Sequence, residues 1–248
     1  MIDIHSHIIF DVDDGPLTID ESLSLLEESY MQGVRTIVST SHRRKGMFET
    51  PEDDILNKFM HVKREAADKF PDLTLLYGGE LYFTADILKK LENNEIPCMN
   101  DTRFALIEFS QMTPWKDIHL ALSQVLMLGI TPIVAYIERY AALEFNGDRV
   151  QELINMGCYT QVNSVHVLKA KLFGDKLKIF KKRTKYFLDK DLVHCISSDM
   201  HNLKKRPPYM KQAYQIVDKV YGTRRARKLF EENATSLINN EFYRRIYE

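Results

Sequence analysis

The chain has 248 residues, 44% of them hydrophobic, and a formal net charge of −1 at pH 7. This length suits one α/β domain, and the near-neutral charge gives no sign of a nucleic-acid partner or a bulk membrane partner. No apolar run is long enough to span a membrane and no signal-peptide pattern is present, so we expect a cytoplasmic protein without membrane insertion. The three scattered cysteines fit a reducing compartment, and none has the downstream arginine that cysteine phosphatases require.

Short apolar strands alternate with longer amphipathic helices along the chain. The predicted strands cover residues 1–5, 34–40, 73–80, 105–109, 131–136, 159–163 and 193–198. The predicted helices cover residues 19–32, 51–69, 85–93, 116–128, 149–156, 176–190, 209–221 and 224–239. Thr18 and Glu21 form a capping box at the first helix, and Gly33 ends it. This alternation predicts a barrel-like α/β fold with parallel strands, whose active site lies at the carboxyl ends of the strands.

Histidines and carboxylates stand at most of these strand ends. His5 and His7 are two residues apart on the first strand, so both imidazoles can point to the same side and bind one metal ion. The other candidate ligands follow later strands or the first loop: Asp14, His42, Glu80, Glu108, Asp199 and His201. Glu80 and Glu108 lie inside apolar runs, where an unpaired charge is rarely buried. The sequence therefore predicts a polynuclear site for Mn, Fe or Zn.

The order of these ligands resembles that of the polymerase and histidinol phosphatase (PHP) superfamily of trinuclear metal hydrolases. More narrowly, the chain is similar to the CpsB-type phosphotyrosine phosphatases that act in capsule and exopolysaccharide synthesis in Gram-positive bacteria. The matching stretches are DIHSHIIFDVDDGP (3–16), STSHRRKGMFETPE (39–52), YGGELY (77–82), ALIEFS (105–110), IERY (137–140), QVNSVH (161–166) and SSDMHN (197–202). They extend over nearly the whole chain in the expected order.

The resemblance implies a distorted seven-stranded (β/α)7 barrel of the PHP type, with mostly parallel strands and a single domain over residues 1–248. It also implies three metal ions, most simply Mn2+, with Fe or Zn as alternatives. His5, His7, Glu80 and Asp199 would bind the first ion, Glu80 and Glu108 the second, and Asp14, His42 and His201 the third. A hydroxide between the first two ions would attack phosphorus directly.

Three further residues are predicted to take part in catalysis. The resemblance places Arg139 and Arg206 at the phosphate, where the planar guanidinium group suits bidentate binding. Asp14 is a candidate for the group that protonates the leaving oxygen, although a metal-bound aspartate is a poor acid. The alternative for both arginines is an ordinary solvated surface position.

One position departs from the family pattern. The family has a histidine ligand two residues before its ERY element, and this chain has Tyr136 there. A phenol has a pKa near 10, so at neutral pH it is a poorer ligand than imidazole unless a strongly acidic ion deprotonates it. We therefore expect weaker binding of the second metal and slower turnover.

The remaining polar residues have simpler interpretations. His61 and His119 are expected on the surface, His194 in the core, and His166 either at the pocket or away from it. The basic stretches 43–45 and 204–206 are expected to rim the active-site mouth or to serve as solubilising charge. The basic stretch 181–183 is most simply the solvated face of a helix.

The leading hypothesis is a metal-dependent phosphotyrosine-protein phosphatase. By resemblance, its partner is the phosphotyrosine-bearing tail of a cytoplasmic tyrosine autokinase that controls capsule or exopolysaccharide synthesis. Two alternatives remain open: an enzyme of the same fold that hydrolyses a small phosphomonoester or a nucleic-acid phosphodiester, and a catalytically impaired phosphotyrosine-binding regulator. The sequence leaves the oligomeric state open.

Overall fold

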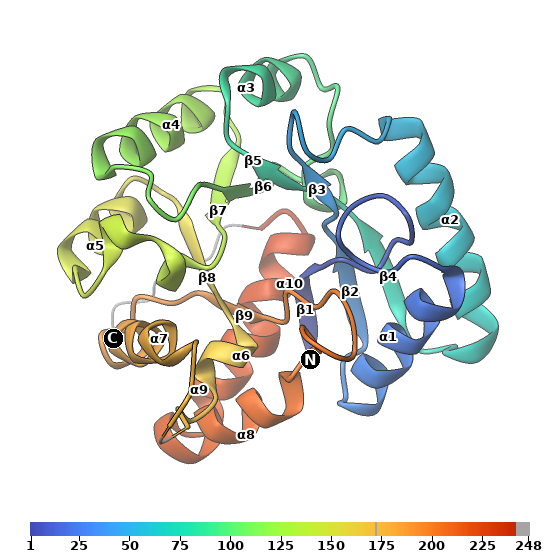
Figure 1. Cartoon of the computed structure of the whole chain (residues 1–248). Coiled ribbons are helices and arrows are strands. Elements are labelled where there is room, and N and C mark those ends of the chain that lie inside the picture. The colour runs from blue at the N-terminus through green and yellow to red at the C-terminus, as the bar shows by residue number, and fades with distance from the viewer. Residues whose placement is uncertain (172, 242–248) are drawn as a thin grey trace.

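Parallel strands occupy the centre of the protein, and helices surround them (Figure 1). The computed structural model describes residues 1–171 and 173–241, so residues 242–248 of the predicted domain lie outside the described residues. The described strands are β1 (Ile2–Ser6), β2 (Thr36–Ser39), β3 (His42–Arg43), β4 (Thr74–Tyr77), β5 (Glu80–Tyr82), β6 (Phe104–Glu108), β7 (Thr131–Val134), β8 (Tyr159–Asn163) and β9 (Cys195–Ser197). They form a three-stranded sheet in the order β1-β2-β4 and a six-stranded sheet in the order β3-β5-β6-β7-β8-β9.

The helices follow the strands as the sequence predicts, with boundaries that shift by one or two residues. The α-helices are α1 (Ile19–Met31), α2 (Glu52–Lys69), α3 (Ala85–Glu92), α4 (Trp115–Met127), α5 (Gly147–Asn155), α6 (Ser164–Val167), α7 (Lys178–Asp189), α8 (Met210–Tyr221), α9 (Thr223–Arg227) and α10 (Asn233–Ile238). Short helical turns complete the chain: η1 (Met99–Asp101), η2 (Ile137–Arg139), η3 (Ala141–Leu143) and η4 (Lys228–Glu232). The helix predicted over 224–239 is therefore divided, because the π-helical η4 separates α9 from α10. The described part of the chain contains no helix with the length and apolar character of a membrane span.

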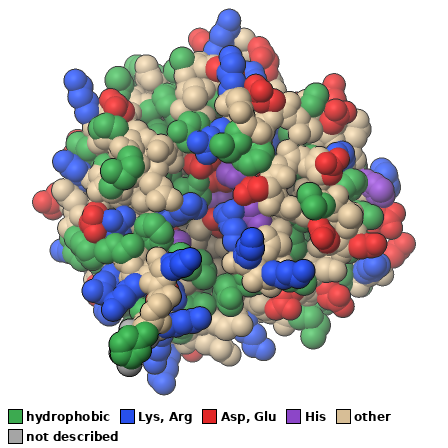
Figure 2. Space-filling view, in the orientation of Figure 1, with side chains coloured by type: hydrophobic (Ala, Val, Ile, Leu, Met, Phe, Trp, Pro, Cys, Tyr) green, Lys and Arg blue, Asp and Glu red, His purple; other side chains and the backbone are tan. Residues whose placement is uncertain are grey.

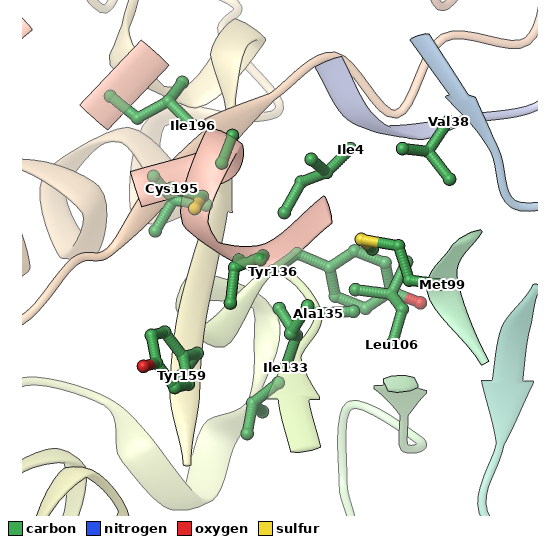
Figure 3. Packing of buried hydrophobic residues seen from close by; sticks show 14 of the residues in the cluster. Ile4, Val38, Met99, Leu106, Ile133, Ala135, Tyr136, Tyr159, Cys195 and Ile196 are labelled. Atoms are coloured by element: carbon green, nitrogen blue, oxygen red, sulfur yellow. The ribbon is translucent and has the colours of Figure 1, made fainter. Parts of the chain in front are cut away.

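Buried apolar side chains from the strands and the inner helix faces form one continuous core. Ile4, Val38 and Leu106 come from three different strands and are inaccessible to solvent. Figure 3 shows Leu106, Ile133 and Ile196 among the neighbouring side chains of this cluster. Burying one such side chain contributes roughly 1.5–3 kcal/mol relative to leaving it exposed. The strands are consequently held in place from both faces.

The predicted seven-stranded barrel is corrected to a curled, two-sheet arrangement. The sheets meet at two seams. At one seam, the Glu80 amide donates a hydrogen bond of 3.1 Å to the Thr40 carbonyl. At the other, the His7 amide donates to the Met200 carbonyl over 2.9 Å and the Asp199 amide donates to the His5 carbonyl over 2.8 Å. The ends of β1 and β9 therefore lie side by side.

The strand predicted over 73–80 is wrong in its extent, because the chain changes sheet within it. Residues Gly78 and Gly79 separate β4 from β5. A Cβ atom on Gly78 would lie 3.3 Å from Val38 Cγ1 and 3.4 Å from Met99 Cα, so the backbone passes very close to its neighbours there. The two-residue β3, which pairs with β5, was not predicted as a strand. An apolar pattern does not reveal such a break, because each half contributes a buried leucine, Leu75 in β4 and Leu81 in β5.

Candidate metal centre

The predicted ligands converge where the two sheets meet. His5 lies next to the last residue of β1, His42 and Glu80 begin the paired strands β3 and β5, and Glu108 ends β6. Asp199 follows β9. Figure 2 shows histidine side chains at the bottom of a hollow near the centre of one face, with basic and acidic side chains around it. Residues that are far apart in sequence thus meet where neighbouring parallel strands end or begin.

Three overlapping groups of side chains have ligand atoms close enough to hold metal ions. The groups are His5, His7, Glu80 and Asp199; His42, Glu80 and Glu108; and His7, Asp14, His42 and His201. Within each group the ligand atoms lie within 4.8 Å of one another. The first group has the same members as the predicted site for the first ion. The allocation of individual ions to the groups stays a prediction.

Glu80 lies at the centre of the cluster. Its Oε2 is 3.2 Å from His5 Nε2, 3.2 Å from His7 Nε2 and 3.1 Å from His42 Nδ1. The carboxylate is completely buried. Glu80 belongs to two of the three ligand groups, so its carboxylate would serve as a ligand in both.

Asp14 and Asp199 complete the cluster on the solvent side. Asp14 Oδ1 lies 3.2 Å from His201 Nε2 and 3.5 Å from His42 Nε2, and its side chain is 48% exposed. Asp199 Oδ1 lies 3.4 Å from His5 Nε2 and 3.6 Å from His7 Nε2. Asp14 is therefore the ligand nearest to bulk water.

The donor set fits metal ions because its atoms are buried and otherwise unused. In the part of the chain that the structure describes, several buried atoms of the cluster form no hydrogen bond: Nε2 of His5, His7 and His201, Nδ1 of His42, both oxygens of Glu80 and Oε2 of Glu108. A buried polar atom without a partner is costly, and a native protein rarely gathers so many in one place. Imidazole nitrogens and carboxylate oxygens together suit Zn, Mn or Fe, so these residues fit the expected ions.

The electrostatics of the cluster favour ionised carboxylates. Burial alone would raise the pKa of Glu80, but His5 and His42 hold that pKa well below its usual range. Burial lowers the pKa of His5, yet the charges of Glu80 and Asp199 outweigh it and raise the value to about 9. Burial and His7 lower the pKa of His201 to about 4, although Asp14 acts in the opposite direction. The carboxylates are thus ready to bind cations.

Burial opposes ionisation of Asp14, but His201, His7 and His42 lower its pKa to about 2. Asp14 is consequently a carboxylate at neutral pH. This favours a ligand role over the role of proton donor, which stays a prediction.

Side chains behind the candidate ligands form a second layer that orients them. Asp13 Oδ2 lies 2.8 Å from His7 Nδ1 and accepts a hydrogen bond of 2.9 Å from the His42 amide. Gln161 Oε1 lies 3.2 Å from His5 Nδ1, and Asn163 Nδ2 donates to Asp199 Oδ2 over 2.6 Å. Such partners fix the tautomer and direction of a ligand. Gln161 and Asn163 belong to the QVNSVH stretch, and this match to the family is the sequence feature that points to their role.

Tyr136 lies beside the cluster in a strained position. Its backbone is left-handed, with φ of 31°, and its side chain is buried. The ring stacks on His5 at a centroid distance of 5.6 Å, and the Arg139 guanidinium lies 4.4 Å from the ring centroid. Burial, together with Glu80 and other neighbouring groups, holds the pKa of the phenol well above its usual range. A neutral phenol is a poor metal ligand, so Tyr136 as a ligand stays a doubtful prediction.

The two predicted arginines approach the cluster from the solvent side. Arg206 Nη2 lies 2.8 Å from Asp199 Oδ1, and its Nη1 lies 3.3 Å from Asp14 Oδ2. Arg139 Nη1 lies 3.7 Å from the other oxygen of Asp199. Both arginines line a cavity of about 290 Å³ next to the cluster. Their guanidinium groups therefore face one space beside the metal ligands.

The predicted basic rim needs one correction. Arg43 is buried and forms an ion pair of 2.7 Å with Glu52, so it does not face the mouth. Arg44 lies over the Tyr82 ring instead, with 4.1 Å between the guanidinium carbon and the ring centroid. Lys205 lines the cavity beside Arg206, as predicted for that stretch.

The remaining histidines divide as follows. His194 is buried beside Thr160, which confirms the core prediction, whereas His61 and His119 are partly exposed on helices. His166 lines the cavity, and its Nδ1 lies 2.6 Å from Glu138 Oε1. Arg183 of the predicted solvated stretch 181–183 is buried and lies 2.8 Å from Glu144, so this part of the prediction is wrong.

The chain belongs to the family described as capsular polysaccharide synthesis, CpsB/CapC, whose model matches residues 1–239. It is 65% identical over 242 residues to the tyrosine-protein phosphatase CpsB of Streptococcus agalactiae serotype V, covering 98% of this chain and 100% of the relative. It is 61% identical to the tyrosine-protein phosphatase CpsB of Streptococcus pneumoniae, covering 97% of this chain and 99% of the relative. The expected family resemblance is thus confirmed.

Solved structures agree with this membership. The chain matches a crystal structure from work on YwqE of Bacillus subtilis and CpsB of Streptococcus pneumoniae, described as unique metal-dependent tyrosine phosphatases, with a TM-score of 0.85 and 27% identity. That match covers 97% of this chain and 95% of the other. The phosphotriesterase homology protein of Escherichia coli, solved with phosphate in its active site, matches over 95% of this chain and 97% of the other at a TM-score of 0.59 and 11% identity, which shows a shared fold only.

Proposed function

We propose that this chain is a metal-dependent tyrosine-protein phosphatase whose substrate is the phosphorylated tail of a cytoplasmic tyrosine autokinase that controls capsule synthesis. Its 65% identity to a tyrosine-protein phosphatase over 98% of the chain supports the enzyme class. Membership in the CpsB/CapC family supports the link to capsular polysaccharide synthesis. The autokinase, the cytoplasmic location, the use of Mn2+ and a single domain over residues 1–248 are the finer parts of the proposal.

One observation supports the phosphatase chemistry above all others. The buried cluster of imidazole and carboxylate atoms that form no hydrogen bond lies directly beside two arginines that face the same cavity. The cluster gathers three or more ligands in each of three groups, and the arginines supply cationic donors for phosphate oxygens. When bound, the metal ions would lower the pKa of water and offset the negative charge that develops on phosphorus.

The residues around the cavity divide the remaining work. Arg206 and Arg139 each face one oxygen of Asp199, so a phosphate in the cavity would meet both guanidinium groups. Asn163 holds Asp199 in place through its amide. Because these groups are fixed by packing and hydrogen bonds, they can stabilise a charged transition state with little rearrangement.

Apolar side chains on the far wall of the cavity suit an aromatic substrate. Val165, Leu177 and Phe180 line the same cavity as the two arginines. Phe180 also lies 5.2 Å from the His166 ring, which limits its movement. A flat aromatic ring that carries a phosphate could pack on this wall while the arginines hold the phosphate. A shorter phosphoserine side chain would not reach both parts of the cavity.

The decisive experiment compares substrates with purified protein and added Mn2+. We expect hydrolysis of a phosphotyrosine peptide in preference to a phosphoserine peptide and to histidinol phosphate. Phe180→Ala should lower kcat/KM for the phosphotyrosine peptide about tenfold, because a buried aromatic contact contributes on the order of 1–1.5 kcal/mol. Ile179→Ala, on the exposed side of α7, is the matched control. Preference for the small phosphomonoester would contradict the proposed substrate.

A second function is favoured by Tyr136, which occupies the position of an expected ligand. In this alternative the chain binds phosphotyrosine and hydrolyses it slowly or not at all. Hydrolysis by the natural protein and by Tyr136→His, with bound metal ions counted in both, separates the two. Equal rates and three ions in each support the phosphatase, whereas an inactive protein rescued by the histidine identifies an impaired enzyme.

A further inference from the structure

Positive charge is concentrated in one short part of this nearly neutral chain. Residues 169–171 and 173–185, here called the lysine segment, contain seven lysines and one arginine but a single carboxylate, Asp175. These residues lie in the connection between α6 and α7 and along most of α7. Figure 1 shows α7 at the edge of the molecule, on the face where Figure 2 shows the histidine hollow. At the lower left of Figure 2, basic side chains surround a protruding hydrophobic side chain.

The single carboxylate of the segment is used to build the loop, and Lys185 pairs with Asp189 of the same helix over 2.6 Å. Asp175 Oδ2 accepts hydrogen bonds from the Lys171 amide and from Lys181 Nζ over 2.8 Å and 3.0 Å. Its Oδ1 accepts from the Leu177 amide over 3.0 Å. The other lysines point outward, and among the described residues no carboxylate pairs with the side chains of Lys169, Lys171, Lys176, Lys178 or Lys182. The charge is therefore presented to a partner outside the chain.

Apolar groups accompany these lysines on the surface. Phe173, in the loop, is 85% exposed, and Val220 on the neighbouring helix α8 is 58% exposed. A groove of about 280 Å³ runs between α7 and α8. Its floor is apolar and consists of Leu168, Leu188, Ile216 and Val220. Four lysines line the same groove: Lys169, Lys181, Lys182 and Lys185. An apolar channel edged by ammonium groups matches a molecule with a hydrocarbon part and an anionic head.

We propose that the lysine segment and the adjoining groove dock this protein on an anionic lipid surface. The lysines would lie against lipid phosphates, while Phe173 inserts its ring among the acyl chains at the interface. Polybasic attraction and one inserted aromatic ring are two signals, and two signals hold a protein on a membrane more firmly than either one alone. The hollow with the metal ligands opens on the same face, so the docked protein holds its active site beside the membrane (Figure 2).

The choice of cation favours lipid over an acidic protein partner. Every exposed cation of the segment is a lysine, because Arg183 is buried and lies 2.8 Å from Glu144. Protein interfaces are enriched in arginine and aromatic residues and depleted of lysine. Clusters of lysine are typical of surfaces that bind anionic membranes without fixed geometry. An acidic polypeptide is accordingly the competing outcome of the test.

The test measures flotation of the whole, metal-loaded protein with vesicles. We expect it to bind vesicles of phosphatidylcholine mixed with phosphatidylglycerol, to ignore phosphatidylcholine alone, and to dissociate as salt is added. A lysine near such a surface contributes on the order of 1 kcal/mol, which corresponds to about fivefold in partitioning. Lys171→Gln, Lys176→Gln and Lys178→Gln together should therefore weaken binding about a hundredfold.

Two further variants make the result specific. Lys63→Gln, Arg64→Gln and Lys69→Gln remove the same charge from exposed positions on α2, on the opposite side of Figure 1, and should leave vesicle binding nearly unchanged. Phe173→Ser should reduce binding severalfold while it leaves the net charge unchanged. Thermal unfolding of each variant checks that the fold is retained.

Three results would overturn the proposal. The first is that both triple variants lose vesicle binding to the same extent, and the second is that the protein binds neutral vesicles as well as anionic ones. The third is that soluble polyglutamate of matched charge displaces the protein completely from vesicles while Phe173→Ser has no effect on binding. The last result would identify an acidic protein as the partner of this surface.

Discussion

The metal centre and the lysine segment both concentrate charged groups, but they do so in opposite ways. At the centre, most charges of both signs are buried, and the nitrogens of the histidine ligands lie 3.1–3.7 Å from carboxylate oxygens of the other ligands. In the lysine segment, charges of one sign are exposed, and most of them have no counter-ion among the described residues. Imidazole and carboxylate atoms that are gathered in a closed space without hydrogen bonds call for a small and highly charged ligand. Unpaired charges on an open surface call for an extended partner.

The same difference governs how firmly each region is built. The centre is held by strand ends from both sheets and by a second layer that includes Asp13 and Gln161. The loop of the lysine segment depends largely on hydrogen bonds to one side chain, Asp175. Substitutions at the centre should therefore abolish chemistry, whereas those in the segment should change attachment or local order.

The largest effect is expected for Glu80→Gln. Glu80 Oε2 faces three imidazole nitrogens, and an amide in its place removes the negative charge that bridges them. Because metal ions supply several kcal/mol of transition-state stabilisation, we expect phosphatase activity to fall about a thousandfold or more. Elemental analysis should find fewer ions per chain. Glu49→Gln, at an exposed position outside the helices and strands, is the control, and an equal loss there would remove the distinction between buried and exposed charge.

A smaller loss is expected for Arg206→Gln. The guanidinium group of Arg206 faces Asp14 and Asp199 and is placed to receive phosphate oxygens. Hydrogen bonds to a charged group contribute about 1.5–3 kcal/mol, so kcat/KM should decrease about 10- to 100-fold. Steady-state kinetics on a phosphotyrosine peptide measures this decrease in kcat/KM. Lys205→Gln is the neighbouring control. Unchanged kinetics with retained metal would show that Arg206 serves only to neutralise the two aspartates.

The ligand set could be predicted from sequence because strand ends carry a strong signal. A carboxylate such as Glu80 or Glu108 inside an apolar run is unusual enough to require a function. The second layer could not be predicted in the same way, because Gln161 and Asn163 are ordinary polar residues whose role depends on distant partners. Arg43 was misjudged for the same reason: its ion pair with Glu52 appears only in three dimensions.

The fold shows a similar division. Alternating strands and helices were predicted from local patterns, and the Thr18 side chain accepts a hydrogen bond from the Glu21 amide as the capping box predicts. The division into two sheets was not predicted. A single strand was expected over residues 73–80, but the backbone changes its pairing partner at Gly78. Strand pairing is a long-range property, and hydrophobic periodicity reports only which face is buried.

Gln161 offers a finer test of how the centre is held. Gln161 Oε1 accepts a hydrogen bond from the Tyr136 amide and lies next to His5 Nδ1. Gln161→Leu removes this acceptor and should weaken metal affinity about tenfold, the lower end for groups that orient ligands. Gln161→Glu keeps an oxygen at the same place and should restore most of the affinity. Calorimetric titration with Mn2+ distinguishes orientation from simple packing, because leucine fills nearly the same space and a packing role predicts little loss of affinity in Gln161→Leu.

The smallest effect is expected in the lysine segment, from Asp175→Ala. Hydrogen bonds from the Lys171 amide, from Lys181 and from the Leu177 amide lower the pKa of Asp175 to about 2. An unfolded aspartate has a pKa near 3.9, so the folded state binds this proton less readily. The stabilisation is therefore present above about pH 4 and is lost as the pH falls from about 4 towards 2. Melting temperatures of the natural protein and the variant should differ modestly near neutral pH and converge in acid.

Glu27→Ala, at an exposed site on α1, should show no such convergence. If the difference for Asp175→Ala were instead constant down to pH 3, the loop would be held by packing of Leu177 rather than by the carboxylate. The segment would then resemble the metal centre more closely than its exposed charges suggest.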